Sequence, residues 1–383
     1  MNKTLLIENG CKELMSYGVW NQKTRLERFV KKMVFGRKAM PEDLIFWPTG
    51  LLADGLWHCR ADLVGMCEDG RQAKTSDNGQ TQEETRQEIQ RIENALTAYF
   101  ERWRKKGMPL YFLDDLVAGE TFLEQYLSQV SKADKESKAG HGRAVQYREA
   151  VDKMAVYAME YAKDEAGSLL YRAGWDNGYV FADTIGIVCP FLYRYGMAFD
   201  RQECMEMAVK QIANFLAYGM DGVSGLPYHG YDMADGCKYG VIGWGRAAGW
   251  ILRGMSKCFL TDYGRERLKE PFIRLVDQVL AYQRPDGAFS WQLQALEGPK
   301  DTSVTGMICA ALKEGIELKI LVGDGYRQAF VRGRDSLEKS IHDGRVYDCS
   351  GECEGFAQYP QRYGAYPWAL GPALMVCENK AQA

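Results

Sequence analysis

The feature that most constrains the fold of this chain is a repeated order of an amphipathic helix, an Asp-Gly turn and a second, more apolar helix. The turns are Asp221-Gly222, Asp286-Gly287 and Asp343-Gly344, about 60 residues apart. Short aromatic pieces follow two of them, at residues 289–292 and 346–347. A helical hairpin cannot bury its apolar face alone, so repeated hairpins must stack into an open solenoid or close into a ring.

Helical periodicity and Gly or Pro punctuation define twelve segments along the chain. These segments cover residues 22–36, 48–63, 82–106, 113–130, 143–163, 183–196, 201–218, 241–260, 265–283, 301–316, 325–341 and 364–378. Six pairs favour a closed ring, in which the more apolar helices line the inside and the amphipathic ones face water. We therefore predict an all-α fold of six helical hairpins, with short β-pieces in the connections at one end. We expect a single domain over residues 1–383, with the polar stretch 131–140 as a mobile loop between helices.

Amino-acid composition and net charge limit the kinds of partner that such a ring can bind. Of the 383 residues, 46% are hydrophobic and 12% aromatic, which is enough for a large core and leaves aromatic side chains for a ligand cleft. The net charge of −3, with no long block of one sign, argues against a nucleic-acid binder and favours a small-molecule partner.

Two sequence features bear on the cellular location: the first residues and the cysteines. The apolar run near Met1 is too short for a signal-peptide core, and no segment is long and uncharged enough to span a membrane. The 11 cysteines are an odd number and are scattered, which favours reduced, mostly buried thiols. We predict a cytoplasmic protein without a membrane contact.

Two carboxylates, Asp114 and Asp183, stand at comparable positions, each at the start of a predicted inner helix. One interpretation is helix capping, because a carboxylate at a helix start accepts backbone N–H bonds. The other is acid–base chemistry, which requires burial or a like-charged neighbour to raise the pKa of the acid. If the two residues lie close together, each supplies such a neighbour.

Further polar and aromatic candidates cluster between residues 174 and 250. His229 lies in a loop rich in Gly, Tyr and Asp, where a hydrogen-bonded loop histidine and a ligand-binding histidine are both reasonable. Arg246 starts an apolar helix, and a buried guanidinium needs an anionic partner such as a substrate carboxylate. Four tryptophans are candidates either for the core or for stacking on sugar rings: Trp175, Trp244, Trp250 and Trp291.

Motifs for other chemistries are missing from the sequence. It has no phosphate-binding glycine loop, no His-Glu-x-x-His pair and no Cys/His spacing typical of zinc. We therefore predict no metal and no cofactor.

Several motifs together resemble a known family. The order is Phe-Ala-Asp-Thr at 181–184, Pro-Phe-Leu at 190–192, Gly-Leu-Pro-Tyr-His-Gly at 225–230 and Trp-Gly-Arg-x-x-Gly-Trp at 244–250. The similarity continues to Asp-Thr-Ser-Val-Thr-Gly-Met at 301–307 and covers most of the chain after about residue 45. This pattern resembles the unsaturated rhamnogalacturonyl hydrolases of glycoside hydrolase family 105, which are related to the unsaturated glucuronyl hydrolases of family 88.

The resemblance implies an (α/α)6 barrel and assigns roles to the candidates. It implies that Asp183 is the catalytic acid/base and Asp114 its supporting carboxylate. Parts of the pocket that it implies are His229, Trp244, Arg246 and Trp250. The implied reaction removes a 4,5-unsaturated galacturonyl group from the non-reducing end of oligosaccharides left by polysaccharide lyases, by hydration of the C4=C5 double bond.

Three alternatives stay open at this point. The substrate could be an unsaturated glucuronyl group, the ring could be a sugar epimerase or isomerase, or it could be a non-catalytic carbohydrate-binding toroid. An epimerase would need a pair of histidines around the sugar, and the chain has only four. The expected partner is a small oligosaccharide, and the expected state is a monomer or a weak homo-oligomer.

Overall fold

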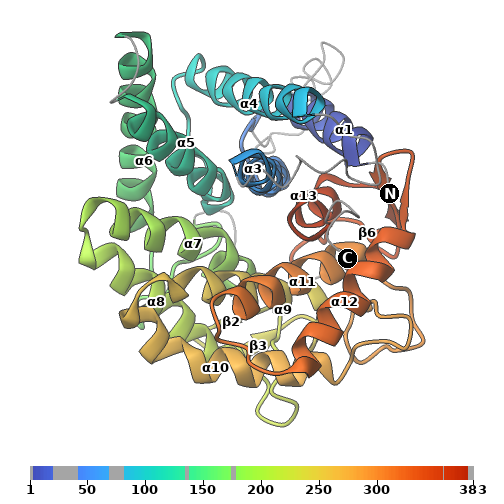
Figure 1. Cartoon of the computed structure of the whole chain (residues 1–383). Coiled ribbons are helices and arrows are strands. Elements are labelled where there is room, and N and C mark those ends of the chain that lie inside the picture. Colours follow the sequence, from blue (N-terminus) through green and yellow to red (C-terminus); the bar gives the residue numbers. More distant parts are fainter. Residues whose placement is uncertain are drawn as a thin grey trace, which may run out of the picture.

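Two concentric rings of helices build the molecule (Figure 1). The computed structural model describes residues 3–19, 42–68, 82–133, 138–173, 178–356 and 358–377. The inner ring consists of α3 (Trp47–Glu68), α5 (Val117–Ala133), α7 (Ala182–Phe199), α9 (Gly245–Ser256), α11 (Thr302–Glu317) and α13 (Pro367–Val376). Each of these helices packs against the next, and α13 packs against α3, so the ring is closed. The predicted all-α ring of helical hairpins is confirmed.

The outer ring alternates with the inner one along the chain. It consists of α1 (Lys3–Ser16), α4 (Gln82–Arg104), α6 (Lys138–Glu160), α8 (Gln202–Tyr218), α10 (Asp262–Leu280) and α12 (Asp324–Lys339). Amphipathic sequence explains the outer position: α4 buries Ile92, Leu96 and Phe100 on one face and is charged elsewhere. The inner α13, by contrast, is buried along its whole length.

Helix α1 is the main departure from the predicted elements. The sequence interpretation treated the first residues only as a possible leader and placed the first helix at 22–36, a segment that lies outside the described residues. Apolar side chains of α1 at Leu6, Ile7, Cys11 and Leu14 are buried against α4, α3 and α13. Their spacing is that of one helix face, so α1 fills the outer position next to α13.

Small residues allow the inner helices to approach closely. Gly55 of α3 faces the backbone of α13, where an added Cβ would lie 2.6 Å from the Cα of Gly371. Gly186 of α7 faces α9 in the same way, because a Cβ there would lie 2.6 Å from the backbone oxygen of Trp250. Side chains larger than hydrogen at these positions would push the ring apart.

The connections from outer to inner helices carry the short strands. Strand β1 (Val180–Phe181) pairs with β2 (Gly230–Asp232), which pairs with β3 (Cys237–Tyr239), all antiparallel. The other pairs are β4 (Ile341–His342) with β5 (Arg345–Val346), and β6 (Cys349–Ser350) with β7 (Tyr363–Gly364).

Positive φ angles at Asp343 and Gly344, 50° and 66°, form the turn between β4 and β5, as the Asp-Gly signal predicts. An isolated bridge joins Trp244 to Gln292, so loops far apart in sequence converge at the N-terminal ends of the inner helices.

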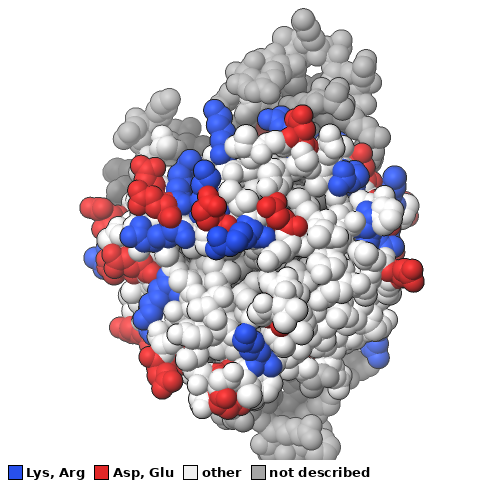
Figure 2. Space-filling model, turned by 90° about the horizontal axis from the view of Figure 1, so that it is seen from below, with Lys and Arg blue, Asp and Glu red and all other residues white. Residues whose placement is uncertain are grey.

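The surface carries no dominant charge on the face shown in Figure 2. Lysine and arginine side chains alternate there with aspartate and glutamate, and a broad area between them is uncharged. Among the described residues, no helix combines the length and apolar character that crossing a membrane requires.

Candidate active site

The short sheet places His229 beside Asp183. Phe181 lies opposite Gly230 in the β1–β2 pair, and the Ala182 N–H donates to the His229 carbonyl over 2.8 Å. As a result, His229 Nε2 lies 3.2 Å from Asp183 Oδ2. The His229 side chain is 1% exposed and that of Asp183 is 13% exposed, so only the carboxylate opens toward a ligand.

Helix capping does not account for either carboxylate. The cap position of α7 is Phe181, without a side-chain cap bond, and Asp183 is the second residue of the helix. In the short 3-10 helix η2 (Leu113–Leu116), Asp115 takes the capping role and accepts the Tyr111 N–H over 2.6 Å. Neither the Asp114 nor the Asp183 carboxylate is therefore needed as a helix cap.

Tyr359 completes a hydrogen-bonded chain behind His229. Its hydroxyl lies 2.8 Å from His229 Nδ1 and accepts the Val241 N–H over 3.3 Å. When the Tyr359 hydroxyl donates a hydrogen bond to Nδ1, the imidazole carries its proton on Nε2. The Nε2–H group then donates a hydrogen bond to an ionised Asp183. With a protonated Asp183, the imidazole can accept at Nε2 and donate to Tyr359 instead. The chain therefore suits Asp183 in both protonation states.

Asp114 lies in a buried polar pocket with Arg172. Its side chain is 4% exposed, and Arg172 Nη2 lies 3.2 Å from its Oδ2. Burial raises the pKa of Asp114, Arg172 opposes the shift, and the negative charge of Asp183 raises the pKa further. A hydrogen bond with the side chain of Tyr171 also opposes the rise in the pKa of Asp114. The charge of Asp183 is thus one of the causes that raise the pKa of Asp114, and the pairing of the two carboxylates in catalysis stays a prediction.

Arg246 has an anionic partner inside the protein, which the sequence interpretation did not foresee. It is 3% exposed, its Nη1 lies 3.7 Å from Asp301 Oδ2, and it donates to Ser350 Oγ over 2.6 Å. Its Nη2 donates to the Gly351 carbonyl over 2.8 Å. Asp301 also caps α11 by accepting the Ser303 N–H. Asp301 thus supplies an anionic partner inside the protein, and the role of Arg246 in substrate binding stays a prediction.

The predicted tryptophans have different surroundings. Trp244 caps α9, is 2% exposed and has its ring centroid 4.2 Å from that of His229. Trp291 is only partly buried, with its ring 6.0 Å from that of Tyr359, so it is the better surface for a sugar. Trp250 is 1% exposed and packs edge-on against Trp47, so it supports the site from the core. Trp175 lies outside the described residues.

Three residues that sequence reasoning missed belong to this cluster: Arg172, Tyr359 and Phe356. The ring of Phe356 lies 4.4 Å from that of Phe181 and 5.2 Å from that of His229. Residues 356–366 contain four aromatic side chains, and this density is a sequence signal that could have identified the segment as part of the site. Arg172 had no such signal, since its role depends on which loop faces Asp114.

Metal-binding geometry is not found in the described ranges, where no three His, Cys, Asp or Glu side chains gather to hold an ion.

Comparisons with known proteins give the family of the chain and relatives of the same fold. Residues 80–379 match the sequence profile described as Glycosyl Hydrolase Family 88. A possible member of the GH105 family from Klebsiella pneumoniae subsp. pneumoniae MGH 78578 has a similar structure, with a TM-score of 0.75 and 14% identity over 98% of this chain and 92% of that chain. A family 105 glycoside hydrolase from C. acetobutylicum ATCC 824 has a TM-score of 0.64 and 17% identity over 94% of this chain and 98% of that chain.

The unsaturated glucuronyl hydrolase of Bacillus sp. GL1 has a TM-score of 0.61 and 16% identity over 88% of this chain and 86% of that chain. At these identities, the structural likeness shows a shared fold. A search of curated protein sequences finds no significant match.

Proposed function

This chain belongs to glycosyl hydrolase family 88, and we propose that it removes a 4,5-unsaturated uronic acid from the non-reducing end of an oligosaccharide by hydrating the C4=C5 double bond. The observation that carries the proposal is the chain from Tyr359 through His229 to Asp183, with the buried Asp114 beside it. His229 and Tyr359 can exchange their hydrogen-bond donor and acceptor roles when Asp183 gains or loses a proton. Asp114 lies close enough to influence Asp183 electrostatically.

In the first step, Asp183 acts as the general acid. It gives its proton to C4, and the positive charge that develops at C5 is shared with the ring oxygen. The remaining Asp183 carboxylate accepts a hydrogen bond from His229 Nε2, 3.2 Å away, which stabilises its new negative charge. Tyr359 holds the imidazole in the required orientation through Nδ1.

In the second step, the same carboxylate acts as the general base. It takes a proton from a water molecule as the water oxygen bonds to C5, which completes the addition of H and OH across the former double bond. The product is a hemiketal at C5. It opens by breaking the bond between C5 and the ring oxygen, and the hemiacetal left at C1 then collapses to an aldehyde and releases the linked sugar. No attack at C1 is needed, so the usual spacing rules for paired glycosidase carboxylates do not apply.

Positive charge near the site would favour the substrate carboxylate. Arg172 is 29% exposed beside Asp114, whereas Arg246 is 3% exposed and bonded to protein acceptors. We assign Arg172 to direct attraction of the anionic sugar. Arg246 adds positive charge although it is buried, and its hydrogen bonds hold Ser350 and Gly351 in place. Trp291, whose ring lies 6.0 Å from that of Tyr359, provides the aromatic surface for the sugar ring.

The linked sugar distinguishes the possible substrates. Galacturonate and glucuronate differ only at C4, and elimination removes that stereocentre, so both give the same unsaturated residue. Preference must therefore come from the linked sugar and the linkage. The motifs from 225 to 250 favour the rhamnogalacturonyl type, and the Bacillus protein named as an unsaturated glucuronyl hydrolase makes the glucuronyl type the alternative.

Replacement of the proposed acid tests the function. Asp183→Asn should abolish the loss of ultraviolet absorbance of the conjugated alkene on unsaturated disaccharides, while the circular dichroism spectrum stays that of wild type. Asp200→Asn is the matched control, because Asp200 ends the same helix in a left-handed conformation that asparagine also adopts well. Retained activity in Asp183→Asn would refute the assignment. Binding of the disaccharides by wild-type protein with no loss of absorbance would instead favour the non-catalytic toroid.

A further inference from the structure

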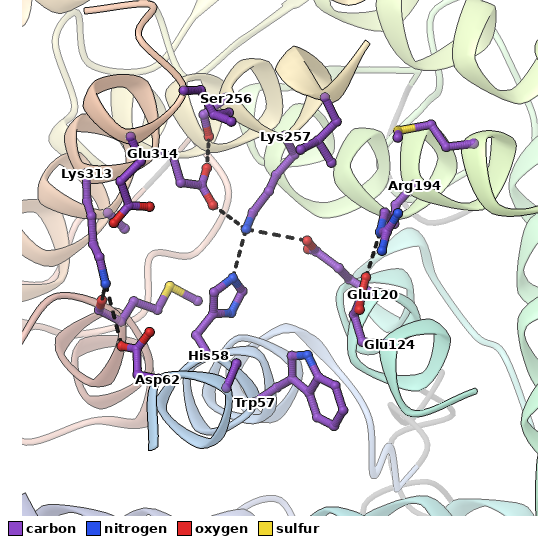
Figure 3. Close-up of a pocket in the computed structure, with 17 residues that line it drawn as sticks. Trp57, His58, Asp62, Glu120, Glu124, Arg194, Ser256, Lys257, Lys313 and Glu314 are labelled. Carbon is purple, nitrogen blue, oxygen red and sulfur yellow. Dashed lines mark hydrogen bonds and ion pairs between the residues drawn. The ribbon is translucent and has the colours of Figure 1, made fainter. Parts of the chain in front are cut away.

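A second cavity lies at the opposite end of the barrel from Asp183. Its volume is about 520 Å³, within the range of small-molecule sites. Helices α7, α9, α11 and α13 end around it, since its wall includes Met197, Ser256, Leu318 and Met375. Figure 3 shows the polar side chains of this wall. The ends of helices present backbone carbonyls, which give this cavity a partial negative potential.

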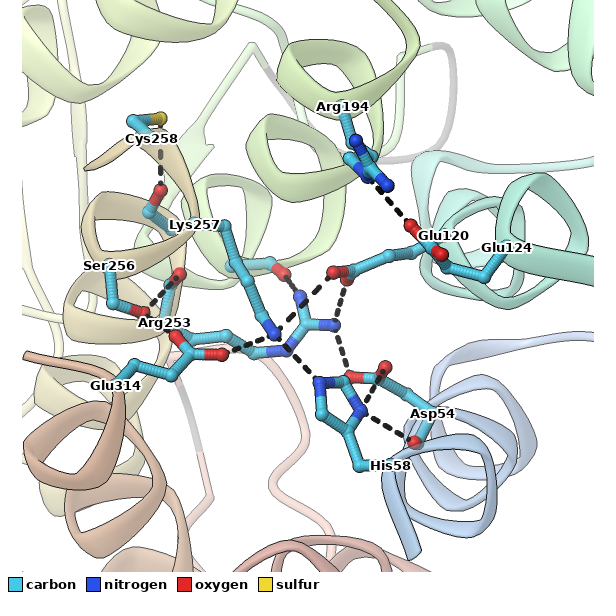
Figure 4. Close-up of polar contacts among 12 residues, drawn as sticks. Asp54, His58, Glu120, Glu124, Arg194, Arg253, Ser256, Lys257, Cys258 and Glu314 are labelled. Atoms are coloured by element: carbon cyan, nitrogen blue, oxygen red, sulfur yellow. Dashed lines mark hydrogen bonds and ion pairs between the residues drawn. The ribbon is translucent and has the colours of Figure 1, made fainter. Parts of the chain in front are cut away.

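A buried ionic layer separates this cavity from the active site. Arg253 of α9 reaches across the barrel, with Nη2 2.7 Å from Asp54 Oδ2 of α3 and 2.6 Å from Glu120 Oε2 of α5 (Figure 4). It also donates to the Gly186 carbonyl of α7. One guanidinium thus joins four of the six inner helices, and a ligand on the far side occupies a different site from the oligosaccharide.

The basic side chains of the cavity wall are already committed to protein partners. Lys257 Nζ forms an ion pair with Glu314 and lies 3.1 Å from His58 Nε2 and 3.6 Å from Glu120 Oε1 (Figure 3). Arg194 pairs with Glu124 over 2.6 Å. Burial and Lys257 oppose a positive charge on His58, but Asp54, whose Oδ1 lies 3.1 Å from His58 Nδ1, outweighs them and raises the pKa of the imidazole.

The acidic side chains outnumber the basic ones. Five carboxylates line the cavity against three lysine or arginine side chains and His58, and Lys313 lies only 3.6 Å from Asp62, which offsets its charge. Glu317, at the exposed end of α11, forms no ion pair or hydrogen bond within the residues that the structure describes, and partial burial together with Asp62 and Glu314 raises the pKa of its carboxyl although Lys313 opposes the shift. The cavity therefore has unneutralised negative charge, which disfavours an anionic ligand such as the proposed substrate or its product.

The rest of the wall suits an organic body. Trp57 is partly buried and lines the cavity, and the Arg60 guanidinium covers one face of its ring, with Cζ 4.9 Å from the ring centroid. Met197, Leu318 and Met375 add apolar surface. An aromatic face beside carboxylates is the usual setting for a bound ammonium group.

From this charge, shape and aromatic wall, we propose that the cavity is a binding site for a small organic cation, a molecule that carries an ammonium group on a short apolar body. Its ammonium group pairs with Glu317 at the rim, and its body lies against Trp57. This site is independent of the proposed hydration chemistry.

Three probes of equal chain length test the charge preference. Cadaverine carries two ammonium groups, 1,5-pentanediol is neutral, and glutarate carries two carboxylates. In calorimetric titrations of the full-length protein, only cadaverine should bind, and its affinity should fall as salt is added. Absence of cadaverine binding, or equal binding of the diol or of glutarate, would overturn the proposal.

Variants locate the bound probe. Glu317→Gln should weaken cadaverine by about three- to fivefold, the size of one partly exposed charge pair. Glu270→Gln, an exposed change on α10, should leave it unchanged. Ala310→Leu, which places a larger side chain in the wall, should weaken binding by at least about tenfold without touching any charge. Wild-type affinity in both cavity variants, or loss of binding in Asp183→Asn alone, would place the cation elsewhere and overturn the proposal.

Discussion

Replacement of Arg253 by methionine should destabilise the barrel through its buried ionic layer. The change leaves Asp54 and Glu120 without the guanidinium that lies 2.7 and 2.6 Å from them. Removing one partner of a buried pair costs about 3–5 kcal/mol. The lower end applies here, because Lys257 lies 3.6 Å from Glu120 and continues to offset its charge. A loss of about 3 kcal/mol over 383 residues corresponds to a fall in Tm of about 4 °C.

The pH dependence of this effect follows from Asp54. Burial alone would raise its pKa, but His58 and Arg253 outweigh burial and hold the pKa below its ordinary value. A carboxyl whose pKa is lowered by folding adds stability above its unfolded pKa of about 3.9 and loses it as the pH falls through the folded value. Without Arg253 the pKa of Asp54 rises, so the folded variant takes up protons at a higher pH than wild type. The difference in Tm should therefore be largest near neutral pH and should narrow toward acid pH.

Thermal unfolding followed by circular dichroism at several pH values measures both effects. Arg267→Met is the matched control, because Arg267 is 46% exposed and its nearest carboxylate, Glu266, lies 3.8 Å away. That variant should change Tm by less than about 1 °C, as expected for an exposed pair. A Tm of Arg253→Met within 1 °C of wild type near neutral pH, or a difference that widens toward acid pH, would refute the reasoning.

Three further changes are informative. Tyr359→Phe removes the hydroxyl 2.8 Å from His229 Nδ1, so kcat should fall about tenfold with KM nearly constant in the absorbance assay; wild-type kcat would contradict the proposed hydrogen-bonded chain. Arg246→Ala should raise KM for the anionic substrate and lower Tm by about 4 °C, because Asp301 is left buried without its cation; an unchanged KM would limit Arg246 to a structural role. Gly55→Ala should destabilise by about 1–3 kcal/mol, more than the helix propensity that alanine gains, because the added Cβ would meet the α13 backbone; urea denaturation measures the sign.

The helical ring could be predicted because its signals are local. Apolar spacing and Gly or Pro punctuation located α3, α4 and most later helices within a few residues. The Asp-Gly signal at 343–344 also predicted a turn, and β4 and β5 meet there. Helix α1 was missed because its residues were considered only as a possible signal peptide, so the helical spacing of its apolar side chains was not weighed.

The active-site candidates could be predicted only in part, because contacts between distant loops decide their roles. His229 and Asp183 are 46 residues apart, and the strand pair that joins them has only two residues in β1. Asp301 was recognised in a motif but not as the partner of Arg246, which lies 55 positions earlier in the chain. Tyr359 was not foreseen, because its contact with His229 spans 130 residues.

The same helices give the two ends of the barrel different chemistry. Helix α9 carries Arg246, paired to Asp301, in its first turn and Arg253, paired to Asp54 and Glu120, about two turns further on. Both guanidinium groups are buried, so the helix carries a fixed positive charge near its N-terminal end and a second one near the middle of the barrel. The N-terminal ends of the inner helices favour an anion, and the carbonyl ends with their surplus of carboxylates favour a cation. Ligands of opposite charge at the two ends would therefore each meet a favourable potential, and Arg253 would keep them apart.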